Sequence, residues 1–139
     1  MARNVERPEY KKYLESGQLK LVAASWDSGL GELIAASQGV IIPSIWPTTT
    51  EYGWLEALAL SKPTITFDIS AHHEFMQNRV NGMLSPIGDF EAMGANMDYL
   101  YLLSDKEYEV FTNNVIKLYQ TLTETTIWIE FLKKIKSHE

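Results

Sequence analysis

The sequence contains no cysteine among its 139 residues. That absence excludes a disulfide scaffold, a thiolate zinc site and a cysteine nucleophile, and it fits a reducing cytoplasm. Long hydrophobic runs are also missing, because no apolar stretch approaches the roughly 18–20 residues of a membrane-spanning helix. The first seven residues lack the apolar segment of a secretory signal peptide. We therefore expect a cytoplasmic protein, with peripheral attachment to a membrane left open.

Positive charge is scarce in the middle of the chain, although the formal net charge of the whole chain is only −6. Residues 21–105 contain two basic side chains, Lys62 and Arg79, against ten acidic ones. A protein that binds duplex DNA or RNA needs a basic surface that displaces counterions from the phosphates. The charge distribution therefore argues against nucleic-acid binding. With 45% hydrophobic and 22% charged residues, the chain is typical of a single globular domain, residues 1–139.

Short apolar or β-branched runs alternate with segments of helical periodicity through the first two-thirds of the chain. The runs predict strands at residues 20–24, 40–42, 64–67 and 83–84. The periodic segments predict helices near residues 30–37, 55–59 and 71–77. Strands that alternate with helices in this way indicate βαβ units. The predicted fold class is therefore α/β, with a partial Rossmann-like open parallel sheet flanked by helices.

The last third of the chain carries helical patterns only, so we expect a helical C-terminal third. Asp89 is placed to cap a helix that begins at the next residue. Two serine or threonine residues stand three positions before a glutamate, Ser104 before Glu107 and Thr121 before Glu124, and this spacing is typical of a capping box. The last helix should bury an apolar face that contains Ile127, Trp128, Phe131, Leu132 and Ile135.

The predicted sheet places the ligand site at one of its edges. In an open parallel sheet, ligands bind beyond the carboxyl ends of the strands. The loops at those ends are residues 25–28, 43–52, 68–73 and 85–89. Trp26 and Trp46 fall in two of them, where a base or a sugar can stack on an exposed indole, although packing is the commoner role of a tryptophan.

The segment 43–56 runs from a strand end into a helix, with a glycine near the helix start. A glycine there lets a ligand approach the backbone N–H groups of Tyr52, Gly53 and Trp54. Those donors and the helix dipole favour an anion such as a phosphate. The segment therefore predicts an anion-binding helix N-terminus.

Polar side chains surround the same helix start. Thr48, Thr49 and Thr50 offer three successive hydroxyls. Glu56 lies one turn into the helix, where a carboxylate can accept hydrogen bonds from a pair of vicinal hydroxyls. The alternative is that Thr50 or Glu51 only caps the helix and that Glu56 is solvated.

Other motifs are weaker. Gly29 and Gly31 precede a helix as in a dinucleotide-binding fingerprint, but Ile34 replaces the third glycine, so an ordinary loop is the better interpretation. Residues 72–74, His-His-Glu, contain metal-ligand types, but adjacent residues face different ways and no third histidine or cysteine is near. The chain also lacks Gly-x-Ser-x-Gly, Gly-x-x-x-x-Gly-Lys and Asp-x-Asp. We therefore expect neither a bound metal nor a cofactor.

Four ordered pieces of the chain, residues 40–44, 55–65, 67–75 and 80–84, resemble one enzyme family. They are similar to the C-terminal, donor-binding half of retaining GT-B glycosyltransferases of the glycosyltransferase family 4 type. The resemblance runs from about Leu33 to Met93. It implies that a nucleotide-diphosphate sugar donates a glycosyl group, without a metal, for polysaccharide, glycolipid or glycoprotein glycan synthesis.

The signature of that family is a pair of glutamates eight positions apart. Glu56 matches the second glutamate, and the resemblance implies that it holds the ribose hydroxyls. Thr48 stands at the first position, which leaves Glu51 as the candidate catalytic carboxylate. The resemblance further implies a donor site in which Tyr52, Gly53 and Trp54 offer amides to the diphosphate, Thr48, Thr49, Thr50 and Glu51 meet the sugar, and Ser25 and Trp26 lie near the base.

Parts of the family pattern have no match in this chain, namely the acceptor-binding half and the arginine–lysine pair that neutralises the diphosphate. The resemblance therefore implies a donor-side portion that is inactive alone and needs the N-terminal acceptor-binding half or another chain. Surfaces that such partners normally cover would also lead to self-association. The alternative from a different class is a non-catalytic α/β binding or assembly module.

Overall fold

The computed structural model describes residues 8–47 and 51–124. The chain divides into two compact units, Met1–Leu30 and Gly31–Glu139, which are described separately. The first unit contains helix α1 (Pro8–Glu15), none of whose residues is buried, and a 3₁₀ turn, η2 (Trp26–Ser28). That both units form one domain, residues 1–139, stays a prediction.

Residues 20–24 form no strand, so the first predicted strand is wrong. Leu21 and Val22 are 63% and 61% exposed. A strand needs a neighbour that pairs with its backbone groups, and the described part of the first unit contains no other strand. The loop 25–28 therefore follows an irregular segment and not a strand end.

The second unit is built on a three-stranded parallel sheet with the strand order β1-β2-β3. The strands are β1 (Val40–Ile42), β2 (Thr64–Phe67) and β3 (Met83–Ser85). Ile65 in the central strand pairs with Ile41 on one side and with Met83 on the other. All four residues of β2 are buried, because strands cover both of its edges and helices cover its faces. The three strands predicted in this unit are confirmed.

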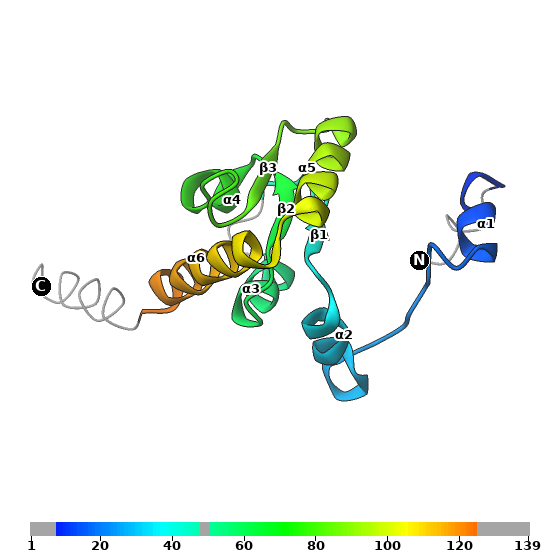
Figure 1. Ribbon diagram of the computed structural model, residues 1–139, viewed down its shortest axis with the longest axis horizontal. Helices are drawn as coiled ribbons and strands as arrows, with labels where there is room; N and C mark the ends of the chain where they lie inside the picture. The colour runs from blue at the N-terminus through cyan, green and yellow to red at the C-terminus, as the bar shows by residue number, and fades with distance from the viewer. Residues whose placement is uncertain (1–7, 48–50, 125–139) are drawn as a thin grey trace, which may run out of the picture. The chain divides into compact units, whose positions relative to one another are not determined.

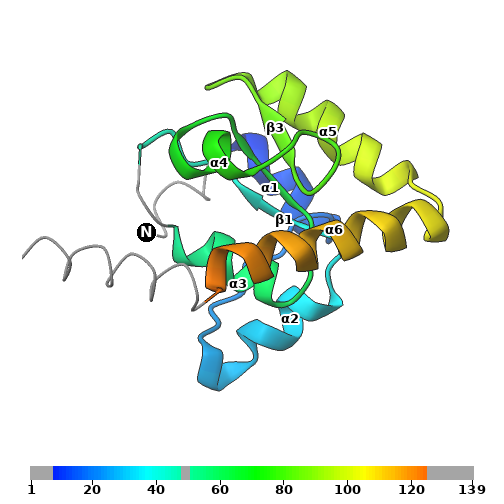
Figure 2. The same cartoon turned by 90° about the vertical axis from the view of Figure 1, so that its left-hand side faces the viewer.

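Helices connect and flank these strands. They are α2 (Leu30–Ala36), α3 (Tyr52–Ala59), α4 (Ser70–Phe75), α5 (Phe90–Leu102) and α6 (Asp105–Thr123). In Figure 1 and Figure 2, α5 lies on one side of the strands, and α3 and α6 lie on the other. The predicted α/β class, a parallel sheet flanked by helices with a helical C-terminal part, is confirmed.

The core of the second unit forms where helices pack on the sheet. From α6, three apolar side chains at intervals of four and three residues enter it: Phe111, Val115 and Leu118. This spacing places them on one helical face. They join Trp54 and Leu58 of α3, which are 2% and 1% exposed. The core therefore fixes α3, the helix that begins at the predicted ligand site.

Side-chain caps begin two of the helices. The Asp89 carboxylate accepts a hydrogen bond from the Ala92 amide (2.9 Å) at the start of α5. At the start of α6, the Ser104 amide donates to the Glu107 carboxylate (2.9 Å), and the Glu107 amide donates to the Ser104 hydroxyl (3.4 Å). Both predicted caps are confirmed.

The second predicted capping box is wrong. Thr121 lies inside α6, and its hydroxyl donates to the Lys117 carbonyl at 3.0 Å. A threonine inside a helix can satisfy its hydroxyl in this way, so the spacing to Glu124 alone does not define a helix start. The apolar face predicted for residues 127–135 lies outside the described residues.

Candidate functional site

The carboxyl ends of the three parallel strands meet at one edge of the sheet, as the sequence predicts for a ligand site. The loop after β1 leads to α3 at Tyr52, and the short loop after β2 leads to α4 at Ser70. Both helices therefore begin at this edge. Three of the predicted site residues, Thr48, Thr49 and Thr50, lie outside the described residues.

Glu51 and His72 lie close together at this edge. His72 Nε2 is 3.6 Å from Glu51 Oε2, which is longer than a hydrogen bond. Burial raises the pKa of Glu51, while a hydrogen bond from the Ser44 hydroxyl lowers it. Burial also lowers the pKa of His72, against the opposing effect of the Phe67 backbone. Both net shifts disfavour the charged form of the side chain.

Trp54 packs against this pair. Its indole meets the His72 imidazole edge-on, with ring centroids 5.0 Å apart and an interplanar angle of 83°. Among the residues that the structure describes, three polar atoms here are buried without a hydrogen-bond partner of normal geometry: Glu51 Oε2, Trp54 Nε1 and His72 Nδ1. A buried unsatisfied polar group costs about 1–3 kcal/mol, so three in one place make this edge the candidate site. We call these three residues, with Trp46 and the N-terminus of α4, the strand-end site.

A narrow recess opens at the strand-end site, between Trp46 and Glu51 on one side and residues 69–72 on the other. It has no room for a water molecule, so a ligand would lie across its mouth. The Trp46 side chain is 77% exposed, which leaves its indole face accessible. The packing role expected for Trp46 is therefore wrong, and stacking on a ligand remains open to it.

Only some of the backbone N–H groups predicted to bind an anion at the start of α3 are available. The Trp54 amide donates to the Glu51 carbonyl at 3.0 Å, so the first turn of α3 already uses it. The prediction that Trp54 offers its amide to a ligand is therefore wrong. Gly53 fits the prediction, because a Cβ at this position would meet no atom within 4 Å.

The other predicted site residues differ in how far they are exposed and in the unit to which they belong. Tyr52 is 78% exposed at the start of α3, and Glu56 is half-buried one turn further along the helix. Ser25 and Trp26 belong to the first unit, where the Ser25 amide donates to the Ser28 hydroxyl at 2.7 Å. Trp26 is 50% exposed, so its packing role stays a prediction.

The two adjacent histidines face different ways, as expected. His72 is 4% exposed, whereas His73 is exposed and its Nδ1 lies 2.8 Å from the Asp68 carboxylate. Within the described ranges, no three metal-ligating side chains converge on one point. The sequence interpretation missed the packing of His72 on Trp54. His72 stands four residues before Met76, which is buried, and this helical spacing could have indicated that His72 is buried too.

Comparison with known proteins identifies the family. A family model for "Glycosyl transferases group 1" matches residues 4–103. The chain belongs to the group 1 glycosyltransferases. No curated protein matches this glycosyltransferase chain in sequence. None of its helices, over the residues that the structure covers, is both long and apolar enough to cross a bilayer.

Two solved structures share the fold of this group 1 glycosyltransferase chain. Anabaena HepE in complex with UDP is 19% identical, with a TM-score of 0.75, over 93% of this chain and 37% of HepE. Anabaena HepE in complex with UDP-glucose is 20% identical, with a TM-score of 0.68, over 95% of this chain and 38% of HepE. The likeness confirms the Rossmann-like class. The chain spans less than two-fifths of the length of HepE.

Proposed function

We propose that this chain is the donor-binding part of a glycosyltransferase and that it binds a uridine diphosphate sugar. The family match over residues 4–103 carries the proposal. The strand-end site supports it, because open parallel sheets bind nucleotides at this edge. The choice of uridine is supported by HepE, whose two structures contain UDP and UDP-glucose.

Each proposed site residue has a role toward one part of the donor. Glu56 accepts hydrogen bonds from the ribose hydroxyls, and the Tyr52 and Gly53 amides face the diphosphate. Thr48, Thr49, Thr50 and Glu51 meet the sugar. In the reaction, the bond between the anomeric carbon and the diphosphate oxygen breaks, and an acceptor hydroxyl forms the new glycosidic bond and passes its proton to the departing diphosphate. The chain would stabilise the leaving diphosphate through oriented amides, without a metal or cofactor.

A shortage of positive charge near the strand-end site would limit binding of a diphosphate by this chain alone. Residues 43–78 contain four carboxylates and one lysine, Lys62, whose ammonium donates to the Ser37 carbonyl at 2.8 Å. A diphosphate leaving group needs cations, and each charge-assisted contact is worth about 1.5–3 kcal/mol. We propose that an N-terminal acceptor-binding half or another chain supplies them, in the cytoplasm or at the membrane periphery. The chain by itself would then bind UDP weakly and transfer no sugar.

Calorimetric titration with UDP tests the proposal, with Glu56→Gln as the key variant. We expect weak but saturable UDP binding and an increase in Kd of about tenfold or more in Glu56→Gln, because the ribose loses a charged acceptor. Glu91→Gln, on the exposed first turn of α5, is the matched control and should leave Kd unchanged.

A non-catalytic binding or assembly module remains the second candidate, because the Trp54 amide is already bonded within α3. Titrations with UDP, GDP and ADP separate the two candidates. Absence of heat with all three diphosphates would favour the module. Equal UDP affinity of the wild type and Glu56→Gln would remove the ribose role while leaving the donor site itself in place.

A further inference from the structure

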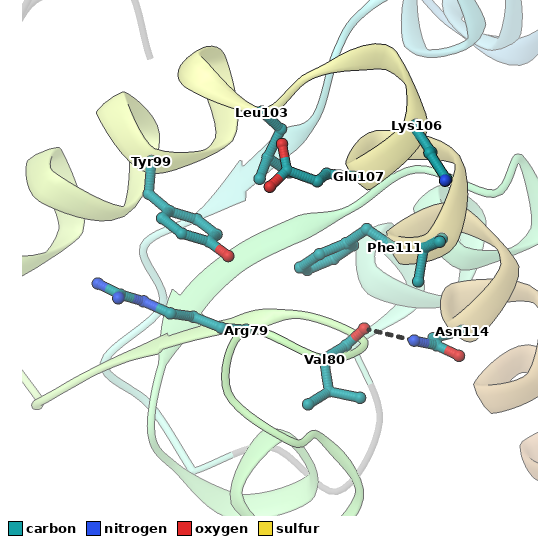
Figure 3. A pocket seen from close by; sticks show the side chains of 9 residues that line it. Arg79, Val80, Tyr99, Leu103, Lys106, Glu107, Phe111 and Asn114 are labelled. Carbon is teal, nitrogen blue, oxygen red and sulfur yellow. Dashed lines mark hydrogen bonds between the residues drawn. The ribbon is translucent and has the colours of Figure 1, made fainter.

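A second cavity is lined by residues from the loop before β3, from α5 and from α6 (Figure 3). One wall is the loop that leads into β3, so the cavity lies at the amino end of that strand, away from the strand-end site. Its volume is ≈ 310 Å³. Pockets for small molecules have volumes of about 300–1,000 Å³, with mostly apolar walls and a few polar groups. The cavity is therefore large enough for a small organic molecule.

The walls of the cavity are apolar. Leu103 follows α5, Val110 and Phe111 come from α6, and Val80 comes from the loop before β3. Phe111 is 5% exposed, whereas Val110 and Val80 are 56% and 43% exposed. An apolar ligand that covers the two valines would remove their surface from water, which favours binding.

Two cationic side chains, Arg79 and Lys106, complete the lining. The Arg79 guanidinium lies over the Tyr99 ring, 4.5 Å from its centroid. Within the described part of the chain, neither cation forms an ion pair. Glu107, the carboxylate in the lining, accepts hydrogen bonds from the Ser104 amide and hydroxyl. The lining contains two cations and one carboxylate, so it keeps a net positive charge that favours an external anion.

The wall that carries Arg79 is held in place by hydrogen bonds. The Asn114 side-chain amide donates to the Val80 carbonyl at 3.3 Å, the contact drawn dashed in Figure 3. The Arg79 amide donates to the Gly82 carbonyl at 2.8 Å. Arg79 adopts φ = +61°, a conformation that a residue with a side chain rarely occupies. The loop thus holds a strained residue that lines the cavity, and such strain often accompanies function.

We propose that this Arg79–Lys106 cavity binds a small organic anion. An aromatic or branched alkyl body would occupy the space between Val80, Val110 and Phe111. In Figure 3 the Arg79 guanidinium and the Lys106 ammonium lie on opposite sides of the cavity, so a single carboxylate or phosphate on that body would form charge-assisted hydrogen bonds with one of them. The site is separate from the strand-end site, so the proposal does not depend on the donor being a nucleotide sugar.

The test uses two probes of similar shape, 3-phenylpropionate and the neutral 3-phenylpropanol, titrated into the ¹⁵N-labelled chain and followed by NMR. We expect saturable shifts at the Val80 and Asn114 amides with the acid, and an affinity about tenfold or more lower for the alcohol. At least one of Arg79→Gln and Lys106→Gln should weaken binding of the acid by a similar factor. Lys117→Gln, also exposed on α6 but outside the cavity lining, is the matched control and should bind as the wild type does.

Two results would overturn the proposal. One is equal affinity for the acid and the alcohol, because the cations would then have no role. The other is the absence of saturable shifts with either probe at millimolar concentration. Val110→Glu places a negative charge at an exposed wall position and should abolish binding of the acid. The UDP affinity of Arg79→Gln, measured separately, should equal that of the wild type, so failure of one site does not hide failure of the other.

Discussion

The imidazole of His72 lies edge-on to the indole of Trp54, with ring centroids 5.0 Å apart. This contact joins α4 to α3 at the strand ends, and Glu51 Oε2 lies 3.6 Å from the same imidazole. A histidine, a carboxylate and an indole therefore form one buried cluster beside the proposed donor site. Any movement that admits a ligand there must change the surroundings of His72.

The stability of the protein should depend on pH through His72. Because burial lowers the pKa of His72 below its ordinary value of 6.5, the unfolded chain binds more protons than the folded chain below that pH. The free energy of unfolding should therefore rise as the pH increases toward about 7, by at most about 1.4 kcal/mol per pH unit. Urea denaturation of His72→Asn should lack this rise. His73→Asn, at the exposed neighbour, should retain it, and a slope that is the same in both variants would contradict the assignment.

Substitutions of Gly53 test the approach of an anion to α3. A Cβ at Gly53 meets no atom within 4 Å, so both Gly53→Ala and Gly53→Val should fold. The β-branched valine would screen the helix amides more than alanine does, and we expect it to weaken UDP binding further. Calorimetric titration with UDP measures the Kd of each variant. Equal Kd values would mean that no phosphate lies at this helix start.

Two glycines should respond to alanine in opposite ways. At Gly39, a Cβ would lie 2.6 Å from Leu100 Cδ2 and 3.0 Å from the Pro63 carbonyl oxygen, so Gly39→Ala should lower the free energy of unfolding by about 1–3 kcal/mol. At Gly94 inside α5, a Cβ meets no atom within 4 Å, so Gly94→Ala should raise it by about 0.5–1 kcal/mol. Urea denaturation measures both, and effects of the same sign would be inconsistent with this packing.

Self-association remains a prediction, and the structure offers a surface for it. β1 is an edge strand of the described sheet, and Ile41 on it is 41% exposed near Met97 and Tyr101, which are 45% and 76% exposed. An uncovered apolar edge favours pairing, and a lysine on the edge opposes it. In light scattering, the wild type should exceed the monomer mass and Ile41→Lys should approach it. Ile87→Lys, 58% exposed in the loop after β3, should associate as the wild type does.

The strands at 40–42, 64–67 and 83–85 were predictable because β-branched and apolar runs stand between proline, glycine and polar breaks. The caps at Asp89 and Ser104 were predictable because each depends on side chains within three residues. The segment 20–24 carries a similar apolar run but forms no strand. A run of this kind shows what a segment can form, whereas pairing depends on a neighbour elsewhere in the chain.

By itself, the sequence determined the alternation of strands and helices in the second unit, the caps and the edge of the sheet where a ligand site would lie, because these depend on residues near one another in the chain. Only the tertiary structure decided which polar groups are buried together. The His72 contact with Trp54 and the Arg79 contact with Tyr99 each join segments 18 or more residues apart. Burial and desolvation arise from packing between such segments, and local sequence patterns carry no direct record of it.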